Sequence, residues 1–423
     1  MSPMERHVLA TAADVTDEDE ISLTPRQRET GATTLDRSKW RADTPACEHL
    51  VHLNNAGTGL PPKVVTERVI SHLRLEEQVG GYEAADRIAV EWEAGRESLA
   101  QLVGGTADGI AVVESTTAAL HKILATVPLR RGHRVLVAGA EYASTLLPLM
   151  QLAQRIGLQL EVLPDDENGV VDLNALAGTV RDDVRLVLAV HAPSHNGLVN
   201  DVAGVGDVLR AADSPAWFVV DACQSLGQLP VDVGTIGCDF LMASGRKYLR
   251  GPRGTGILHA SDRALQELDA YPLDIRGAQL TSELEFVTDP TAVRFESWER
   301  SVAVGLGLMA AANYTLATGM PSITTAIGRN AEYLRSNLGA LRGWRVLDRG
   351  NRRSGIVVAR HRSVAPEEIV PALRRQRVNL HVVPASSSPR DLGGESALRL
   401  SPHAFNNQAD LDRALGLLAD LTE

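Results

Sequence analysis

Short apolar runs alternate with longer stretches of mixed polarity from about residue 50 to Asp289. The apolar runs predict strands at residues 109–113, 134–138, 158–163, 186–190 and 217–220. The stretches between them have the length of helices, and two of these helices are expected to begin near Thr116 and Thr145. Apolar strands separated by helices are typical of a parallel sheet that is covered on both faces. We therefore predict an α/β domain, which we place at residues 49–290.

The segment from Ser301 to Gly328 carries no charged residue. It superficially resembles a membrane span, but the part before Gly319 is shorter than the ~20 apolar residues that a bilayer requires. The small side chains of residues 310–312 instead suit a helix that is packed between neighbours. We therefore expect a buried helix and no contact with a membrane.

A different pattern follows this helix. It predicts strands at residues 355–359, 378–383 and 397–400, and helices at Pro366–Arg375 and Asp410–Leu421. Asn407 is a suitable N-cap for the last helix, because its side chain can accept a hydrogen bond from a backbone N–H of the first turn. Residues 291–423 are therefore predicted to form a linking helix and a smaller α+β domain. A ligand is expected between the two domains, at the ends of the sheet strands.

The N-terminal residues 1–48 are polar and show no periodicity, so they are predicted to form a mobile or loosely docked arm. A short apolar run lies at Val8–Ala13, but acidic residues precede and follow it. Secretory signal peptides have a basic segment before their apolar core, so we expect no signal peptide here.

The amino-acid composition narrows the class of protein. Of the 423 residues, 44% are hydrophobic and 22% are charged, which is typical of a globular chain. The 42 basic residues are outnumbered by 53 acidic ones, giving a net charge of −11, so no binding of nucleic acid is expected. The three cysteines, Cys47, Cys223 and Cys238, form no CxxC pair and predict neither a disulfide framework nor a metal site. We expect a cytoplasmic protein without a metal ion.

Several common catalytic motifs are absent, namely GxxxxGK[ST], HExxH, GxSxG and a GxGxxG that follows a strand. What stands out is Lys247, which follows the apolar run from Phe240 and precedes a glycine-rich turn that ends at Gly256. Upstream, the apolar run that starts at Trp217 ends in Asp221. Because both residues follow strands of the same predicted sheet, they are expected to reach one pocket.

These residues satisfy the chemical requirements of pyridoxal phosphate. Its aldehyde needs an amine such as Lys247, and its ring nitrogen needs a carboxylate such as Asp221 to stay protonated. Its phosphate needs hydroxyls and backbone N–H groups at a helix N-terminus, which Ser115, Thr116 and Thr117 offer. Taken singly, the features are compatible with a surface lysine, a turn and a plain N-cap. Their order and spacing together favour a pyridoxal-phosphate site.

From His52 to the C-terminus the chain resembles the fold-type I, class V pyridoxal-phosphate enzymes. This group includes cysteine desulfurases, isopenicillin N epimerases, kynureninases and serine–pyruvate aminotransferases. The most specific motifs are Asp221-Ala-Cys-Gln224 and Ser244-Gly-Arg-Lys247. The resemblance implies a mainly parallel seven-stranded sheet in the large domain, a homodimer, and catalytic roles for Lys247 and Asp221. It implies that the cofactor is bound by Thr116, Thr117, Tyr142, Asp221, Gln224, Ser244, Arg246 and Lys247.

The resemblance also implies three substrate-binding residues, Asn55, His195 and Arg399. Arg399 matches the arginine that binds a substrate carboxylate, and the alternative is an ion pair with a nearby acid such as Glu395. His195 falls on a loop that is expected near the cofactor ring, and the alternative is a solvated loop histidine.

Two segments depart from the family pattern. Relatives often carry a histidine at the position of Ala143, where its ring stacks on the cofactor. Tyr142 is expected to supply this stacking face, with a packed core tyrosine as the alternative. Many relatives also have Gly-Thr-Pro after the position of Glu296, and this segment contacts the phosphate bound by the neighbouring subunit. Here the segment is Ser297-Trp-Glu-Arg300, which leaves that contact open.

The reaction type follows from a missing residue and from a closer resemblance. A cysteine desulfurase needs a nucleophilic thiol in the C-terminal half, but the last cysteine is Cys238, and residues 384–389 carry serines instead. The block from Gly245 to Gly256 is most similar to a bacterial subgroup that includes the C–S β-lyase of ergothioneine biosynthesis. We therefore predict a C–S β-lyase of a sulfur-containing natural-product pathway, which converts an S-substituted cysteine into a thiol, pyruvate and ammonia. The alternatives are an aminotransferase or epimerase, decarboxylation-coupled oxidative deamination, and a non-catalytic regulator that binds the cofactor.

Overall fold

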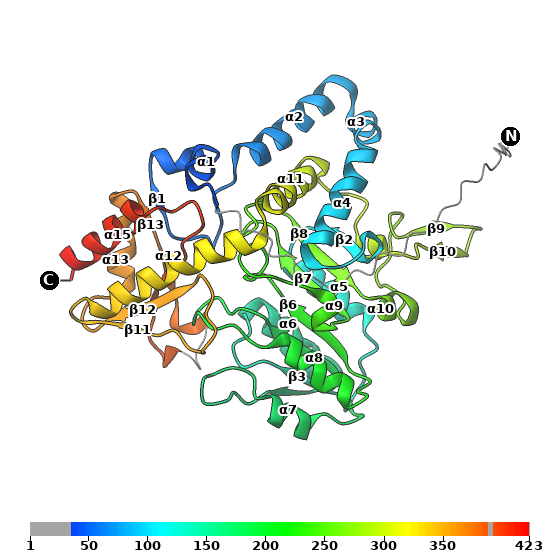
Figure 1. Cartoon of the computed structure of the whole chain (residues 1–423). Coiled ribbons are helices and arrows are strands. Elements are labelled where there is room, and N and C mark those ends of the chain that lie inside the picture. Colours follow the sequence, from blue (N-terminus) through cyan, green and yellow to red (C-terminus); the bar gives the residue numbers. More distant parts are fainter. Residues whose placement is uncertain (1–34, 388–391, 423) are drawn as a thin grey trace, which may run out of the picture. The chain divides into compact units, whose positions relative to one another are not determined.

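The structure, a computed structural model, describes residues 35–387 and 392–422 and contains a large seven-stranded sheet (Figure 1). Its strand order is β2-β8-β7-β6-β5-β3-β4. The strands are β2 (Ile110–Val113), β3 (Arg134–Val137), β4 (Gln159–Val162), β5 (Val184–Val190), β6 (Trp217–Asp221), β7 (Phe240–Ser244) and β8 (Gly256–Ala260). All run in the same direction except β8, which pairs antiparallel with β2 and β7. The predicted α/β class with a mainly parallel sheet is confirmed.

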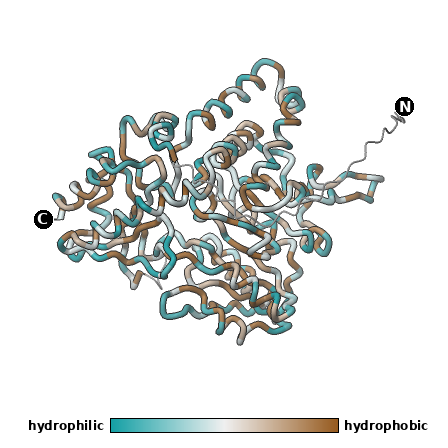
Figure 2. The backbone as a smooth tube through the Cα atoms, viewed as in Figure 1, coloured by the Kyte–Doolittle hydropathy of each residue, from teal (hydrophilic) through white to brown (hydrophobic). Residues whose placement is uncertain are grey.

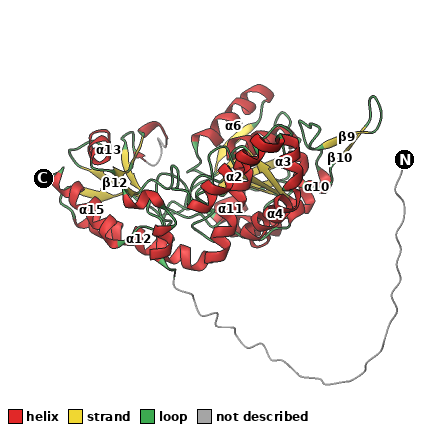
Figure 3. Cartoon of the chain, turned by 90° about the horizontal axis from the view of Figure 1, so that it is seen from above, coloured by secondary structure: helices red, strands yellow, loops and turns green. Residues whose placement is uncertain are grey.

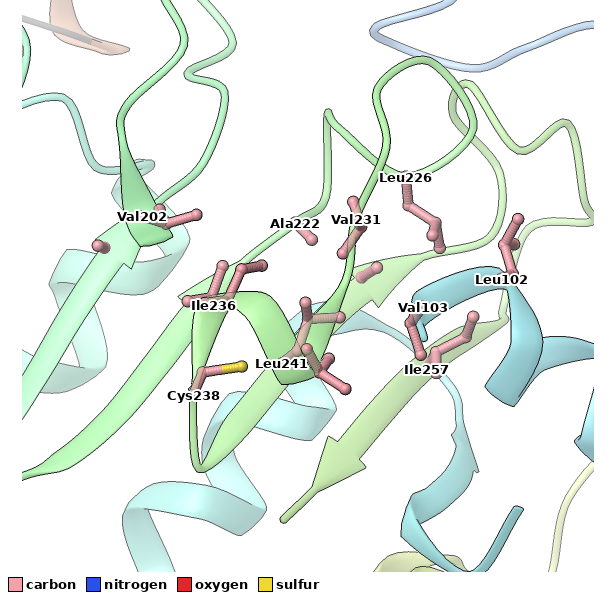
Figure 4. Close-up of a cluster of buried hydrophobic side chains, with 14 of the residues drawn as sticks. Leu102, Val103, Val202, Ala222, Leu226, Val231, Ile236, Cys238, Leu241 and Ile257 are labelled. Atoms are coloured by element: carbon pink, nitrogen blue, oxygen red, sulfur yellow. The ribbon is translucent and has the colours of Figure 1, made fainter. Parts of the chain in front are cut away.

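Helices cover both faces of this sheet. One face packs against α4 (Ala89–Val103), α7 (Leu173–Thr179), α8 (Val202–Ala211), α9 (Val233–Ile236) and α11 (Val302–Thr318). The other face packs against α5 (Thr116–Thr126), α6 (Ala143–Ile156) and α10 (Asp262–Glu267). Successive side chains of a strand point to opposite faces, so Leu241 joins the first core and Met242 the second. Figure 4 shows part of the first core, with Leu241, Ile257 and Cys238 among its apolar side chains.

A second, antiparallel sheet has the strand order β11-β12-β15-β14. Its strands are β11 (Trp344–Val346), β12 (Val357–His361), β14 (His381–Val383) and β15 (Ala397–Leu400), and it packs against α12 (Met320–Ala340), α13 (Pro366–Arg375) and α15 (Gln408–Asp420). The predicted helix at Pro366–Arg375 is found with the same bounds. Asn407 caps α15, because its side chain accepts a hydrogen bond from the Asp410 N–H. The predicted division into two domains near residue 290 stays a prediction, because residues 34–423 form one compact unit.

The N-terminal part of the described chain differs from the predicted arm. Residues 1–34 lie outside the described residues, but residues 35–48 form α1 (Arg37–Ala42) and a 3-10 turn at Pro45–Glu48. Trp40 of α1 is 4% exposed, so this segment is not loosely docked. The next strand, β1 (Val51–His52), pairs in parallel with β13 (Val378–Asn379) and not with the large sheet. This segment differs from the predicted arm because it contacts segments that are distant in the sequence, and local polarity does not reveal such contacts.

The uncharged segment from Ser301 is divided at Gly319, as expected. Gly319 has a φ of +87°, a conformation that favours glycine, and this residue separates α11 from α12. Among the described residues no single helix is long and apolar enough to cross a membrane; α11 and α12 together meet the length and composition test as a pair bent by 87°. In this structure α11 lies against α2 (Lys63–Val79) and α4.

The remaining elements include a hairpin that projects from the large sheet region (Figure 3). They are α3 (Gly81–Arg87), β9 (Ala278–Leu280), β10 (Phe286–Thr288) and 3-10 turns at Ala107–Gly109, Ala292–Phe295 and Ala385–Ser387. Figure 2 shows mostly apolar residues along the central strands and a mixture of polar and apolar residues along α2. The hairpin is an exception, since Leu284 at its tip is 94% exposed.

Candidate active site

A cavity lies at the carboxyl ends of β5, β6 and β7, beside the first residues of α5 and α6. Ligands bind at this edge in open α/β sheets. The residues assigned to the cofactor from sequence all line this cavity, namely Thr116, Thr117, Tyr142, Asp221, Gln224, Ser244, Arg246 and Lys247. The structure thus brings the predicted residues together, and their individual roles remain predictions.

Lys247 lies in the turn that follows β7 and is 8% exposed. Its Nζ lies 5.8 Å from the centroid of the Tyr142 ring. Two backbone hydrogen bonds hold the turn: the Gly59 N–H donates to the carbonyl of Arg246 (2.7 Å), and the Arg250 N–H donates to that of Lys247 (3.0 Å). A Cβ atom at Gly59 would lie 2.3 Å from the Lys247 carbonyl oxygen, so this close approach requires glycine. The amine is therefore presented to the cavity from a well-fixed backbone.

Asp221, the last residue of β6, is a buried acid in the cavity wall. Its Oδ1 accepts a hydrogen bond from the Cys223 N–H at 2.8 Å. Burial raises the pKa of Asp221, while the charge of Lys247 and the Cys223 N–H oppose this shift. A buried carboxylate with so few partners is stabilised by a cationic hydrogen-bond donor placed in the cavity.

The start of α5 brings hydroxyls and a helix N-terminus to one end of the cavity. Ser115 caps the helix by accepting a hydrogen bond from the Ala118 N–H. The Thr116 and Ser244 hydroxyl oxygens lie 2.8 Å apart, and the exposed Thr117 follows in the first turn. The positive end of the helix dipole and two or three hydroxyls together suit a phosphate group.

Gln224 and Arg246 are both held by the loop that follows β1. Gln224 Nε2 donates to the Ala56 carbonyl at 3.0 Å, which leaves its buried Oε1 without a hydrogen-bond partner in the cavity wall. Arg246 Nη1 donates to the Gly57 carbonyl. Residues from the N-terminal side of the chain thereby fix two cavity side chains of the large sheet.

Arg399 lies on β15 and is 5% exposed. Its Nη1 donates to the Ser194 carbonyl (3.0 Å) and its Nη2 to Asn54 Oδ1 (3.1 Å), while its Nε has no hydrogen-bond partner. Burial lowers the pKa of Arg399 to about 10. The alternative of an ion pair with Glu395 is wrong, because Glu395 pairs with Arg360 at 2.7 Å. A buried guanidinium held only by neutral groups is suited to an anionic ligand.

Asn55 and His195 do not line the cavity. Asn55 is fully buried, and its Nδ2 donates to the Ser401 carbonyl at 2.8 Å, so the predicted contact with substrate is not supported; the neighbouring Asn54 holds Arg399 instead. His195 is 1% exposed, so the alternative of a solvated histidine is wrong. Its substrate role stays a prediction.

Tyr142 and Cys223 both line the cavity. Tyr142 is 47% exposed, so it is not a packed core tyrosine, and its ring is available beside Lys247. Cys223 lies after β6 rather than within it and lines the cavity, with its Sγ 3.1 Å from Thr116 Oγ1.

Sequence reasoning missed Glu141, which precedes Tyr142. Glu141 is 3% exposed, and its Oε1 accepts a hydrogen bond from the Val190 N–H at 2.5 Å. Burial, and then the charge of Asp221, raise the pKa of Glu141 well above its usual value. No local signal marks it, because an acid before a helix usually faces solvent.

The donor set of the cavity fits pyridoxal phosphate. The cavity offers an amine for the aldehyde and a buried acid for the ring nitrogen. It also offers an acceptor without a partner for the ring hydroxyl, and a helix N-terminus with hydroxyls for the phosphate. They belong to Lys247, Asp221, Gln224 and Thr116. In the described ranges, no group of three or more His, Cys, Asp or Glu side chains could hold a metal ion.

Comparisons with known proteins agree with this fit. Residues 51–414 match a family model described as class V aminotransferase. The chain is 30% identical over 308 residues to a probable cysteine desulfurase of Methanothermobacter thermautotrophicus, covering 72% of this chain and 76% of the relative. It is 28% identical over 378 residues to a probable hercynylcysteine sulfoxide lyase of Mycobacterium tuberculosis, covering 88% of this chain and 90% of the relative.

A solved structure shows the same fold. The apo cysteine desulfurase from Thermococcus onnurineus NA1 has a TM-score of 0.84 with this chain at 24% sequence identity. The match covers 92% of this chain and 98% of that one. The architecture of both sheets is therefore shared along nearly the whole described chain.

Proposed function

The chain belongs to the class V aminotransferase family of pyridoxal-phosphate-dependent enzymes, and we propose that it is a C–S β-lyase. Its substrate would be a cysteine whose sulfur carries an organic substituent R, and the pathway would be one that makes a sulfur-containing natural product. The overall reaction converts RS–CH2–CH(NH3+)–COO− and water into RSH, pyruvate and ammonium. The observation that carries the proposal is the absence of any cysteine after Cys238 in a chain whose relatives include desulfurases and a sulfoxide lyase.

The surroundings of the three thiols favour a reaction that transfers no sulfur to the protein. Burial raises the pKa of Cys47 to about 11 and that of Cys238 to about 12, so neither is a thiolate near neutral pH. Cys238 also packs among apolar side chains on the sheet face (Figure 4). Cys223 contacts Thr116 at the end of the cavity suited to phosphate. This arrangement supports release of the sulfur as a free thiol.

Lys247, Asp221 and Arg399 have distinct proposed roles, the first two in the cavity wall and Arg399 on β15. When bound, pyridoxal phosphate supplies an electron sink for negative charge that develops at the substrate Cα. Lys247 Nζ would hold the cofactor, and the same amine would remove the proton from the substrate Cα. Asp221 keeps the ring nitrogen protonated, and Arg399 holds the substrate carboxylate with its planar fork. A thiolate is a good leaving group, so the site needs no strong acid at the sulfur.

The fate of the amino group tests this proposal. Wild-type enzyme would be incubated with S-benzyl-cysteine, with and without an added α-keto acid. We expect ammonia and free thiol in both cases. Formation of a new amino acid from the keto acid without thiol would show an aminotransferase instead. Inverted substrate without thiol would show an epimerase, and release of carbon dioxide would show oxidative decarboxylation.

A Cys223→Ala variant completes this test. Since the thiol contributes no step in the proposed reaction, we expect less than about a tenfold loss of thiol release, with cofactor content unchanged. Loss of thiol release from a variant that still binds the cofactor would return an enzyme persulfide to consideration.

The role of Arg399 leads to a separate prediction. Arg399→Lys keeps the positive charge but loses the pair of hydrogen bonds to the substrate carboxylate. The substrate Cα–H bond is then no longer oriented toward Lys247. We expect kcat/KM to fall by about 10²-fold, with cofactor content and Tm nearly unchanged. Arg360→Lys is a matched control, because Arg360 lies in the same sheet and pairs with Glu395. If Arg399→Lys lowers only Tm, Arg399 is a structural residue and the carboxylate binds elsewhere.

A homodimer is also part of the proposal. The hairpin of β9 and β10 exposes the apolar side chains of Leu280, Leu284, Phe286 and Val287, and exposed apolar surface of this kind marks an interface. Trp298, in the segment that departs from the family pattern, is 47% exposed. Light scattering in solution should give twice the mass of one chain, and the mass of a single chain would contradict this.

A further inference from the structure

Lys247 and Arg399 lie on different sheets, so their relative position depends on contacts outside the cavity. Lys247 follows β7 of the seven-stranded sheet, and Arg399 lies on β15 of the four-stranded sheet. In the proposed reaction, the side chain that removes a proton and the side chain that grips the carboxylate act on one substrate. An error of about 1 Å in such an arrangement can cost 10²-fold in rate.

Arg250, which closes the Lys247 turn, has an unusual backbone and an unusual environment. Its φ is +66°, a left-handed conformation that is uncommon for a residue with a long side chain. The side chain is 2% exposed, its Nε donates to the Leu60 carbonyl (2.7 Å) and its Nη2 to Thr44 Oγ1 (2.5 Å). Burial lowers the pKa of Arg250 to about 10. Within the described residues no acid lies at salt-bridge distance from it, so other groups must stabilise the cation.

Aromatic rings, rather than an acid, surround the Arg250 guanidinium. The Arg250 Cζ lies 5.0 Å from the ring centroids of Trp40 and Phe405, and 5.8 Å from that of Tyr314. A guanidinium removed from water is attracted electrostatically to the faces of aromatic rings. Trp40 belongs to α1, Phe405 to the loop after β15 and Tyr314 to α11. Three separate segments therefore hold the end of the Lys247 turn.

His403 extends these contacts toward Arg399. Its ring is nearly parallel to that of Phe405, with centroids 5.2 Å apart, and it also stacks on Trp40 at 5.5 Å. Its Nδ1 accepts a hydrogen bond from the Ala404 N–H, so its Nε2 is the donor to the Tyr248 carbonyl at 2.9 Å. Tyr248 directly follows Lys247 in the sequence, and His403 lies four residues after Arg399. The His403 ring thus joins the two catalytic segments.

Helix α1 covers this aromatic cluster, defined as Trp40, Tyr248, Tyr314, His403 and Phe405. Trp40 Nε1 donates to Thr318 Oγ1 at 3.3 Å. Arg41 pairs with Asp410 at 2.6 Å and donates to the Phe405 carbonyl at 3.1 Å. These bonds anchor α1 to α11 and to the C-terminal part of the chain at the same time.

We propose that Trp40 is a positioning residue, which fixes the Lys247 turn relative to Arg399 through Arg250 and His403. The proposal rests on the roles that the proposed function gives to Lys247 and Arg399. Under this proposal, helix α1 helps to set the geometry of the site and does more than stabilise the fold. Loss of the indole ring would leave Arg250 without one of its two closest aromatic faces and His403 without one stacking partner.

The test compares two substitutions of similar size. Trp40→Leu keeps an apolar but smaller side chain and removes the aromatic face, and Trp40→Phe keeps a smaller face. Trp344→Leu is the control, because Trp344 is also buried, in β11, where its ring packs on His361. For each variant we would measure Tm, the affinity of the apoprotein for pyridoxal phosphate, the pH titration of the visible absorption band, and kcat and KM with S-benzyl-cysteine.

We expect Trp40→Leu to weaken cofactor affinity by about tenfold, to shift the pH midpoint of the visible band, and to lower kcat/KM by about 10²-fold. Trp40→Phe should lie closer to the wild type, and Trp344→Leu should lower Tm alone. The proposal is overturned if Trp40→Leu behaves like Trp344→Leu, with wild-type affinity and titration. Cofactor affinity and titration do not depend on the reaction type, so a wild type that binds cofactor but releases no thiol refutes the lyase proposal alone.

Discussion

Replacing Lys247 by alanine should abolish turnover and remove the visible absorption of the enzyme-bound cofactor. The cavity presents this amine next to Tyr142, from a turn that is fixed by backbone hydrogen bonds. Both covalent attachment of the cofactor and proton removal from the substrate would be lost. We expect the rate to fall by about 10⁴-fold or more. Absorption spectra and a thiol-release assay of the purified variant give the measurement.

The lysine content of the chain makes the control simple. The other lysines of the sequence are Lys39, Lys63 and Lys122. Lys122 lies on α5 outside the cavity, where its Nζ donates to Ser297 Oγ at 3.3 Å, so Lys122→Ala should keep the visible band and the activity. Borohydride reduction of wild-type enzyme should label the peptide that contains Lys247. A coloured and active Lys247→Ala variant would contradict the whole assignment of the cavity.

Replacing Asp221 by asparagine should lower the rate by about 10²–10³-fold, because a neutral amide does not keep the cofactor ring nitrogen protonated. Asp221 is buried, and burial raises its pKa, so a cationic partner is favoured beside the carboxylate. The variant should fold and bind cofactor with reduced affinity. Steady-state rates at matched cofactor occupancy are the measurement.

Asp239→Asn is the matched control for this substitution. Asp239 is also buried, but it precedes β7 at the opposite end of the strands and accepts a hydrogen bond from the Phe218 N–H at 2.8 Å. Its replacement should lower Tm and leave the rate per bound cofactor unchanged. Near-wild-type turnover of Asp221→Asn would mean that another group protonates the ring.

Elements with local signals could be predicted from the sequence. The helix at Pro366–Arg375 starts with proline at a position where its missing N–H costs nothing, and the structure has the same bounds. Asn407 gives α15 a capping box with Asp410. The resemblance to the family named the eight cofactor residues, and the structure brings them to one cavity, while their roles stay predictions.

Features that depend on distant pairing could not be predicted. Val51 pairs with Val378, and no property of the sequence around either residue reveals this. Residues 35–48 look like part of a polar arm, yet Trp40 is buried against Arg250, which lies 210 residues later in the sequence. In both cases the deciding interaction is tertiary.

Within the site, the direction of a single side chain is harder to predict than the place of its segment, and the substrate contact of Asn55 stays a prediction. Asn55 was expected to contact substrate, but Asn54 lies against Arg399 and Asn55 holds the Ser401 carbonyl. Resemblance places a segment correctly and leaves the direction of each side chain undetermined. Glu141 was missed because its burial depends on Val190, which lies on the neighbouring strand β5.

The most direct test of the central claim is the ratio of thiol to pyruvate released from a single S-substituted cysteine. The wild-type enzyme would be loaded with pyridoxal phosphate and supplied with S-benzyl-cysteine in excess, without any added thiol or keto acid. β-Elimination without an enzyme persulfide predicts one free thiol and one pyruvate for each substrate consumed, from the first turnover onward. Pyruvate or alanine formed while the sulfur stays on the protein, or substrate consumed without thiol, would contradict the account.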